Sequence, residues 1–143
     1  TSLVTEDILG QLVERKTQIM ACEAIAVPQA IIREPHLFAG SDVIWFIDNE
    51  AACSSLVRGT SSQDDIGTIA GVTHFLMLRY NIRIWYEWID SNSNPADGLS
   101  RDGLLDEWTV RQGWELANSE SLRWHEMMST VPVDKGIVRL MTA

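Results

Sequence analysis

The sequence predicts an α/β domain, because two short apolar runs with strand character alternate with longer segments of helical periodicity. Val43–Ile47 consists of consecutive β-branched and aromatic residues, the pattern of a fully buried, parallel strand. Ile82–Ile89 alternates between an apolar face and a face that carries Arg83 and Glu87, which is typical of an edge strand. We expect the two strands to be neighbours in one sheet, with the intervening helix crossing over a face.

The segments between and after these strands have clear helix signals. Apolar residues recur at helical spacing over Ile66–Tyr80, which predicts an amphipathic helix that packs on the sheet. A shorter helix is expected from Ala51, and Gly59 and Asn81 are the expected left-handed stops of the two helices. His74 on the longer helix is expected to be a half-buried structural histidine.

The first part of the chain has weaker signals. Thr5, followed by two acids, predicts an N-capped amphipathic helix with basic residues near its C-terminal end at Lys16. Thr17–Met20 suggests a short strand. Ala21–Val27 then predicts a helix, which Pro28 is expected to kink or end.

Composition limits the class of protein. The chain has 143 residues and a net charge of −9, which suits one globular domain and disfavours strong autonomous binding to a nucleic-acid backbone. No apolar run approaches the roughly 20 residues of a membrane span, so no such span is expected. Cys22 and Cys53 lack metal-ligand spacing and are expected to be buried free thiols of an intracellular, reducing compartment.

Three acids occupy positions where α/β proteins place their chemistry. Asp48 ends the first strand, Asp97 follows the second, and Glu23 lies in the apolar segment Ala21–Val27. Each also has a structural interpretation, since Asp48 or Asn49 can cap the next helix and Glu23 can lie on an outer helix face. If the three carboxylates converge, they can hold divalent cations, and two such cations roughly 4 Å apart support phosphodiester cleavage.

Three strings carry a resemblance to a known family: QIMACEA at residues 18–24, FIDNEAA at 46–52 and SNPADGLSR at 93–101. In this order they resemble the later half of the ribonuclease H domain of retroelement polyproteins, most of all DIRS-type and related elements of unicellular eukaryotes. The match covers roughly Thr17–Arg101. The Asn-Pro-Ala-Asp string with its downstream Ser-Arg is its most specific part.

The resemblance implies a ribonuclease H-like mixed sheet flanked by helices, and cleavage of the RNA strand of an RNA–DNA hybrid with Mg²⁺ or Mn²⁺. By this resemblance, Glu23, Asp48 and Asp97 correspond to catalytic acids and metal ligands of the family. The family's first catalytic Asp lies on an earlier central strand, which has no counterpart in Thr1–Lys16. The first strands are therefore expected to be missing from this chain, and the chain alone is expected to be inactive.

The alternative is a repurposed, non-catalytic structural or interaction subunit of a larger assembly. The expected division is a ribonuclease H-like domain over residues 1–103 and a C-terminal extension over residues 104–143. The extension carries Trp108, Trp114 and Trp124, which either cover the domain or bind a protein partner. At least one of the three is expected to bury most of its ring, because large aromatic patches left in water promote aggregation.

Overall fold

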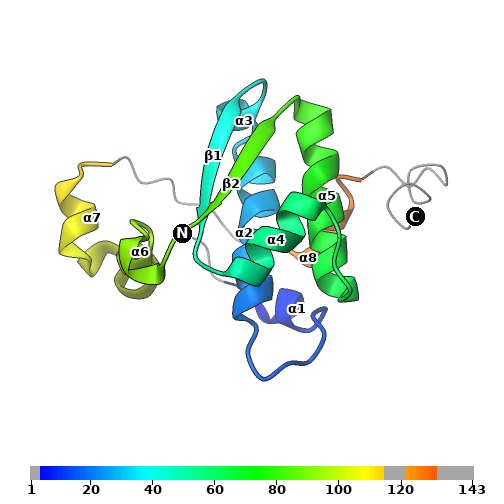
Figure 1. Cartoon of the computed structure of the whole chain (residues 1–143), viewed down its shortest axis with the longest axis horizontal. Coiled ribbons are helices and arrows are strands. Elements are labelled where there is room, and N and C mark those ends of the chain that lie inside the picture. The colour runs from blue at the N-terminus through cyan, green and yellow to red at the C-terminus, as the bar shows by residue number, and fades with distance from the viewer. Residues whose placement is uncertain (1–3, 115–121, 132–143) are drawn as a thin grey trace.

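The computed structural model describes residues 4–114 and 122–131 and has a mixed α/β fold with a small sheet (Figure 1). Strands β1 (Asp42–Ile47) and β2 (Arg83–Trp88) pair in parallel, in a register that runs from Asp42 opposite Arg83 to Ile47 opposite Trp88. Helices α4 (Glu50–Arg58) and α5 (Asp64–Tyr80) connect them. The predicted neighbouring strands and helical crossover are confirmed.

Helices form the larger part of the structure. Figure 1 shows α2 (Ile19–Arg33) and α5 side by side, and α4 packs against both of them. The remaining elements are short: α1 (Glu6–Leu9), α3 (Pro35–Phe38), η1 (Ser91–Ser93), α6 (Asp97–Asp102), η2 (Gly103–Leu105), α7 (Glu107–Arg111) and α8 (Trp124–Met128). In the described part of the chain, no helix has both the length and the apolarity that a bilayer crossing requires.

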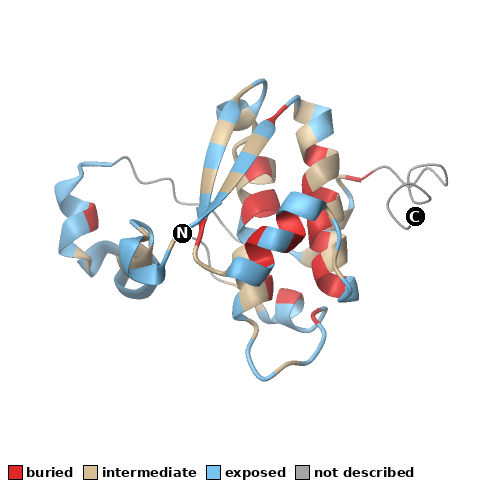
Figure 2. Ribbon diagram, viewed as in Figure 1, coloured by how far each residue is buried: buried red, intermediate tan, exposed pale blue. Residues whose placement is uncertain are grey.

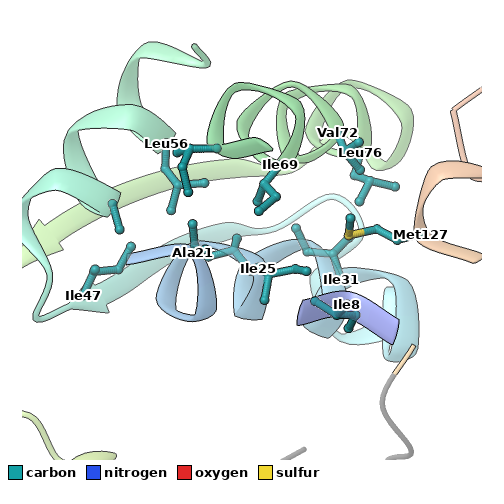
Figure 3. Close-up of a cluster of buried hydrophobic side chains, with 14 of the residues drawn as sticks. Ile8, Ala21, Ile25, Ile31, Ile47, Leu56, Ile69, Val72, Leu76 and Met127 are labelled. Atoms are coloured by element: carbon teal, nitrogen blue, oxygen red, sulfur yellow. The ribbon is translucent and has the colours of Figure 1, made fainter. Parts of the chain in front are cut away.

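The core lies where α2, α4 and α5 meet. Figure 3 shows Ile25 of α2, Leu56 of α4 and Ile69 of α5 converging, and each of them is almost completely buried. Ile47 at the end of β1 and Met127 of α8 also belong to this cluster. Burial of these side chains supplies most of the driving force for folding, at about 25 cal/mol per Å² of apolar surface.

The expectation that Val43–Ile47 is fully buried is wrong. Figure 2 shows buried residues gathered on the helices, whereas both strands are mostly exposed or intermediate. Val43, Trp45 and Ile47 point toward the helices, but Ile44 on the opposite face is 66% exposed. Its neighbour in register, Trp85, is 68% exposed. No further strand pairs with the sheet within the described residues, so one face and one edge of β1 lack cover.

The N-terminal expectations are also corrected. Helix α1 ends at Leu9, far short of Lys16, and residues 11–18 form neither helix nor strand. Long-range contacts explain the irregular path, because the Val13 N–H and the Arg15 side chain both bind the carboxylate of Asp65 at the start of α5. The strand expected at Thr17–Met20 is absent, since α2 already begins at Ile19.

Pro28 does not end its helix. Helix α2 continues five residues beyond it, to Arg33. Proline in a helix interior costs about 3 kcal/mol because it removes one backbone hydrogen bond and crowds the preceding turn. Val27, Pro28 and Ile31 are all buried on the face that packs in the core, and this tertiary burial outweighs the local cost.

The predicted helix stops are confirmed. Gly59 after α4 has φ 71° and Asn81 after α5 has φ 53°, both in the left-handed region. His74 is half-buried and its Nε2 lies 2.7 Å from the Leu56 carbonyl oxygen, so its predicted structural role is also confirmed. Both cysteines are free thiols, Cys53 buried and Cys22 half-buried, and burial raises the pKa of each.

Candidate functional site

Asp48 lies at the C-terminal end of β1 and is not the cap of α4. The cap is Asn49, whose Oδ1 accepts a hydrogen bond from the Ala52 N–H at 2.9 Å. The Asp48 carbonyl oxygen accepts a hydrogen bond from Trp88 Nε1 at 3.3 Å, which fixes the strand end to β2. Within the described residues, the Asp48 carboxylate itself makes no hydrogen bond or ion pair. It is therefore free for another role.

Glu23 lies on α2 and is half-buried rather than on a solvated outer face. Burial raises the pKa of its carboxyl group, and the charges of Asp48 and Asp97 raise it further. Asp48, directly after β1, and Asp97, at the start of α6, therefore both act on Glu23 through their charges.

Asp97 is the first residue of α6. The polar turn that precedes it contains Asp90, which caps η1 by accepting a hydrogen bond from the Ser93 N–H at 3.1 Å. One helical turn further, Arg101 forms an ion pair with the Asp97 carboxylate. This pairing neutralises part of the negative charge beside Glu23.

The donor set suits a hard cation, because carboxylate oxygens are the ligands that Mg²⁺ and Mn²⁺ prefer. As placed in the described part of the chain, however, no three His, Cys, Asp or Glu side chains are close enough together to hold one ion. In this arrangement the three acids therefore do not form a closed ligand set. Their assignment as metal ligands and catalytic groups stays a prediction.

The sequence interpretation missed an open groove of about 840 Å³, which is not lined by any of the three acids. Its lining begins at Asn49 and Glu50, directly after Asp48, and includes Met20 from α2, one turn before Glu23. The other lining residues are mostly small or polar: Ala51, Ser54, Ser55, Arg58, Thr60, Ser61, Ser62 and Gln63. Hydroxyl and amide groups with one arginine can bind sugar and phosphate oxygens. In the sequence, the polar residues Ser54–Ser55 and Thr60–Gln63 cluster in and after one short helix, and this clustering was the signal that could have predicted the groove.

The three tryptophans of the C-terminal extension separate into two groups. Trp124 of α8 is half-buried against the core, so the prediction that at least one ring is mostly buried is confirmed. Trp108 and Trp114 are exposed and contact each other edge to face, with ring centroids 5.5 Å apart. Trp108 belongs to α7 and Trp114 follows that helix in the chain, and Figure 1 shows α6 and α7 away from the core. Whether they bind a partner stays a prediction, and residues 115–121 and 132–143 lie outside the described part of the chain.

The motifs at residues 18–24, 46–52 and 93–101 remain the sole basis for the ribonuclease H resemblance. The fold agrees with it at the level of a mixed α/β class with two parallel strands. Comparison with protein-family models, with curated proteins and with solved structures gives no match for this chain.

Proposed function

We propose that the chain is a ribonuclease H-like module descended from a retroelement polyprotein, whose parent cleaves the RNA strand of RNA–DNA hybrids with Mg²⁺ or Mn²⁺. In this proposal Glu23, Asp48 and Asp97 are the metal ligands that this chain contributes. The chain alone is inactive, because the family uses a further carboxylate on an earlier strand.

One observation supports the proposal: the charges of Asp48 and Asp97, from two other elements, act on the half-buried Glu23, although this costs free energy. The pKa of Glu23 is raised by burial and by its two acidic neighbours, so its ionised form is destabilised in the folded chain. Because Asn49 caps α4, helix formation does not require Asp48 at this position. A carboxylate that the fold does not need, next in the chain to residues that line an open groove, is typical of a functional site.

The groove supports the choice of substrate class. It extends from Asn49 and Glu50, which follow Asp48 in the chain, to Arg58 at the end of α4, along a lining rich in serine and threonine. A sugar–phosphate backbone presents hydroxyl and phosphate oxygens at regular spacing, which such a lining can bind. Arg58 is the cation in the groove, and its Nε donates to the Ser54 carbonyl oxygen at 3.3 Å. This bond leaves the other guanidinium donors available to a phosphate.

The residues of this chain have distinct parts in the proposed site. Asp48 is held at the end of β1 and offers an unpaired carboxylate, and the half-buried Glu23 supplies a second one. Asp97 would have to break its ion pair with Arg101 before it could bind the metal. A bound divalent metal supplies water activation and stabilisation of the leaving oxygen. With three acids and one of them already paired, we expect weak metal binding and no cleavage.

The first experiment measures Mn²⁺ binding by calorimetry and cleavage of an RNA–DNA hybrid by the full chain. We expect weak Mn²⁺ binding that Asp48→Asn and Glu23→Gln each reduce by about 10-fold or more, a loss of roughly 1.4 kcal/mol per ligand. Asp64→Asn is the matched control, because Asp64 is an exposed acid at the start of α5. Equal binding by the control and by Asp48→Asn would contradict the metal site.

The second candidate function is a non-catalytic interaction subunit. The exposed Trp108–Trp114 pair and the net charge of −9 favour it, since aromatics are enriched at interfaces and acidity opposes nucleic-acid binding. The two functions differ when a strand pair carrying the family's Asp is joined to the chain. The ribonuclease H proposal expects stronger Mn²⁺ binding and hybrid cleavage that Asp48→Asn abolishes, whereas the subunit proposal expects neither.

A further inference from the structure

The segment from η2 to Trp114 carries its apolar side chains on the outside. Five large apolar residues lie in it, and each is between 48% and 86% exposed: Leu104, Leu105, Trp108, Val110 and Trp114. We call these five residues the tryptophan surface. The residue that α7 buries is the polar Thr109, whereas a helix that packs on its own domain buries its apolar residues. An exposed apolar surface of this kind indicates a site of interaction.

Polar contacts hold together the elements that carry this surface. Asp106 caps α7 by accepting a hydrogen bond from the Thr109 N–H at 2.9 Å. Its carboxylate also lies close to α6, because a Cβ added at Gly98 would be 2.5 Å from Asp106 Oδ1. Figure 1 shows α6 and α7 apart from the core helices, and Figure 2 shows most of α7 exposed. The five apolar side chains thus lie outside a segment that polar contacts organise.

Trp108 and Trp114 supply the two aromatic rings of the surface. Their centroids are 5.5 Å apart and their planes meet at 83°. The edge of one ring therefore covers one face of the other, and the remaining ring faces stay open. The face of an aromatic ring is electrically negative and attracts a lysine or arginine side chain placed over it. The pair thus offers both apolar area and a place for a cation.

The charges of the same segment favour a basic partner. Both of its arginines already pair with acids: Arg101 with Asp97 and Arg111 with Glu107. Asp102 and Asp106 form no ion pair within the described residues. Hydrogen bonds from Thr109 lower the pKa of Asp106, so its carboxylate is ionised at neutral pH. Two acids beside the exposed rings are therefore available to cations from outside.

Other classes of partner fit this surface less well. Nucleic-acid bases stack on exposed aromatic rings where unpaired cations track the backbone, but here both arginines are paired with acids. An anionic membrane surface is disfavoured for the same reason. A second copy of the chain would bring the same acids together, and each copy has a net charge of −9. A basic protein surface complements both the rings and the acids.

We propose that the tryptophan surface binds a basic, amphipathic segment of another protein. Apolar side chains of that segment cover Leu105 and the two tryptophan rings, and its lysine or arginine side chains lie over the open ring faces and reach Asp102 and Asp106. The proposal gives the second candidate function a class of partner. It does not rest on metal binding by the three acids, so either one can fail while the other holds.

A peptide of leucine and arginine at helical spacing is the probe, titrated into the full chain. Calorimetry measures its affinity, and the indole N–H signals in NMR spectra report on each tryptophan. We expect saturable binding that shifts the signals of Trp108 and Trp114 more than that of Trp85, which is exposed on β2. Trp108→Ala should weaken binding by about 10-fold or more. Asp48→Asn, which tests the metal site, should leave binding unchanged.

Two matched pairs of variants show whether binding is specific to this surface. Leu105 and Leu78 are 86% and 83% exposed, so alanine at either position should leave the fold intact. Only Leu105→Ala should weaken peptide binding, by about 3-fold or more. Asp102→Asn should weaken it by about 2-fold or more, whereas Asp64→Asn, which alters an exposed acid at the start of α5, should not.

Three further probes test the other classes of partner: the same peptide with glutamate in place of arginine, vesicles of anionic lipid, and a single-stranded oligonucleotide. Preference for the arginine peptide, with losses confined to the Trp108, Leu105 and Asp102 variants, supports the proposal. Absence of binding, equal losses in the control variants, or equal or tighter binding of another probe would overturn it. Indole shifts that follow protein concentration without peptide would also overturn it, because they indicate a second copy on this surface.

Discussion

Arg15 and Asp65 form an ion pair that joins residues 50 positions apart, with Arg15 Nη1 donating to Asp65 Oδ2 at 2.7 Å. The Asp65 side chain is only 3% exposed. Burial raises the pKa of this carboxyl group, but hydrogen bonds from Arg15 and from the N–H groups of Val13 and Ile66 outweigh burial and lower the pKa overall. The pair therefore stabilises the fold above the ordinary aspartate pKa and loses its effect as the pH falls through the lowered value.

Loss of Arg15 should destabilise the chain strongly. Arg15→Ala leaves a buried carboxylate without its cation, and we expect the free energy of unfolding to fall by about 3 kcal/mol. Lys16→Ala, the neighbouring exposed cation, is the matched control and should change it by about 0.5 kcal/mol or less. Urea denaturation at neutral pH measures both. Similar losses in the two variants would show that the pair does not anchor this segment.

The pH dependence of stability should carry the signature of Glu23. Between the ordinary glutamate pKa of 4.5 and the raised pKa in the folded chain, the folded state binds a proton that the unfolded state does not. Lowering the pH through this window therefore stabilises the fold. Glu23→Gln should be more stable than the original chain at neutral pH and should flatten the stability profile within that pH window. The exposed Glu14→Gln should leave the profile unchanged, and identical profiles for all three proteins would refute the coupling.

A comparison of alanine variants at Gly59 and Gly40 distinguishes the cost of backbone strain from the cost of a steric contact with a side chain. Both have a left-handed φ, 71° and 70°, so alanine at either position costs about 1 kcal/mol. A Cβ at Gly59 would also lie 3.0 Å from the His74 ring, whereas a Cβ at Gly40 meets nothing within 4 Å. We expect Gly59→Ala to cost at least about 1 kcal/mol more than Gly40→Ala in urea denaturation. Equal costs would mean that His74 moves freely.

Trp124 and Trp108 should differ in their contribution to stability. The Trp124 ring packs against the core, whereas the hydrogen bond to Asp7 Oδ2 at 2.9 Å comes from the Trp124 backbone N–H and is kept by alanine. We expect Trp124→Ala to lower the free energy of unfolding by on the order of 2 kcal/mol. Trp108→Ala removes only the edge-to-face contact with Trp114 and should cost about 1 kcal/mol or less. Thermal denaturation distinguishes them, and a larger loss for Trp108 would show that α7 belongs to the core.

Local patterns in the sequence determined the elements with a strong periodic or conformational signal. The alternation in Ile82–Ile89 and the apolar run Val43–Ile47 predicted two parallel neighbouring strands, and Gly59 and Asn81 predicted helix ends. These succeed because strand alternation, helical spacing and left-handed stops depend on residues close in the chain. The order of Glu23, Asp48 and Asp97 likewise predicted acids at one end of the sheet, and in the structure the charges of Asp48 and Asp97 raise the pKa of Glu23.

The tertiary structure decided what depends on distant residues. Whether Asp48 or Asn49 caps α4 is set by the path of the chain out of β1, and both are good caps by composition. Pro28 stays inside α2 because the buried face of that helix packs in the core, a gain that no local pattern contains. Residues 11–18 have no regular structure because Asp65, far along the chain, binds Val13 and Arg15. Exposure of β1 also depends on what packs beside it, and a strand's own composition cannot supply that.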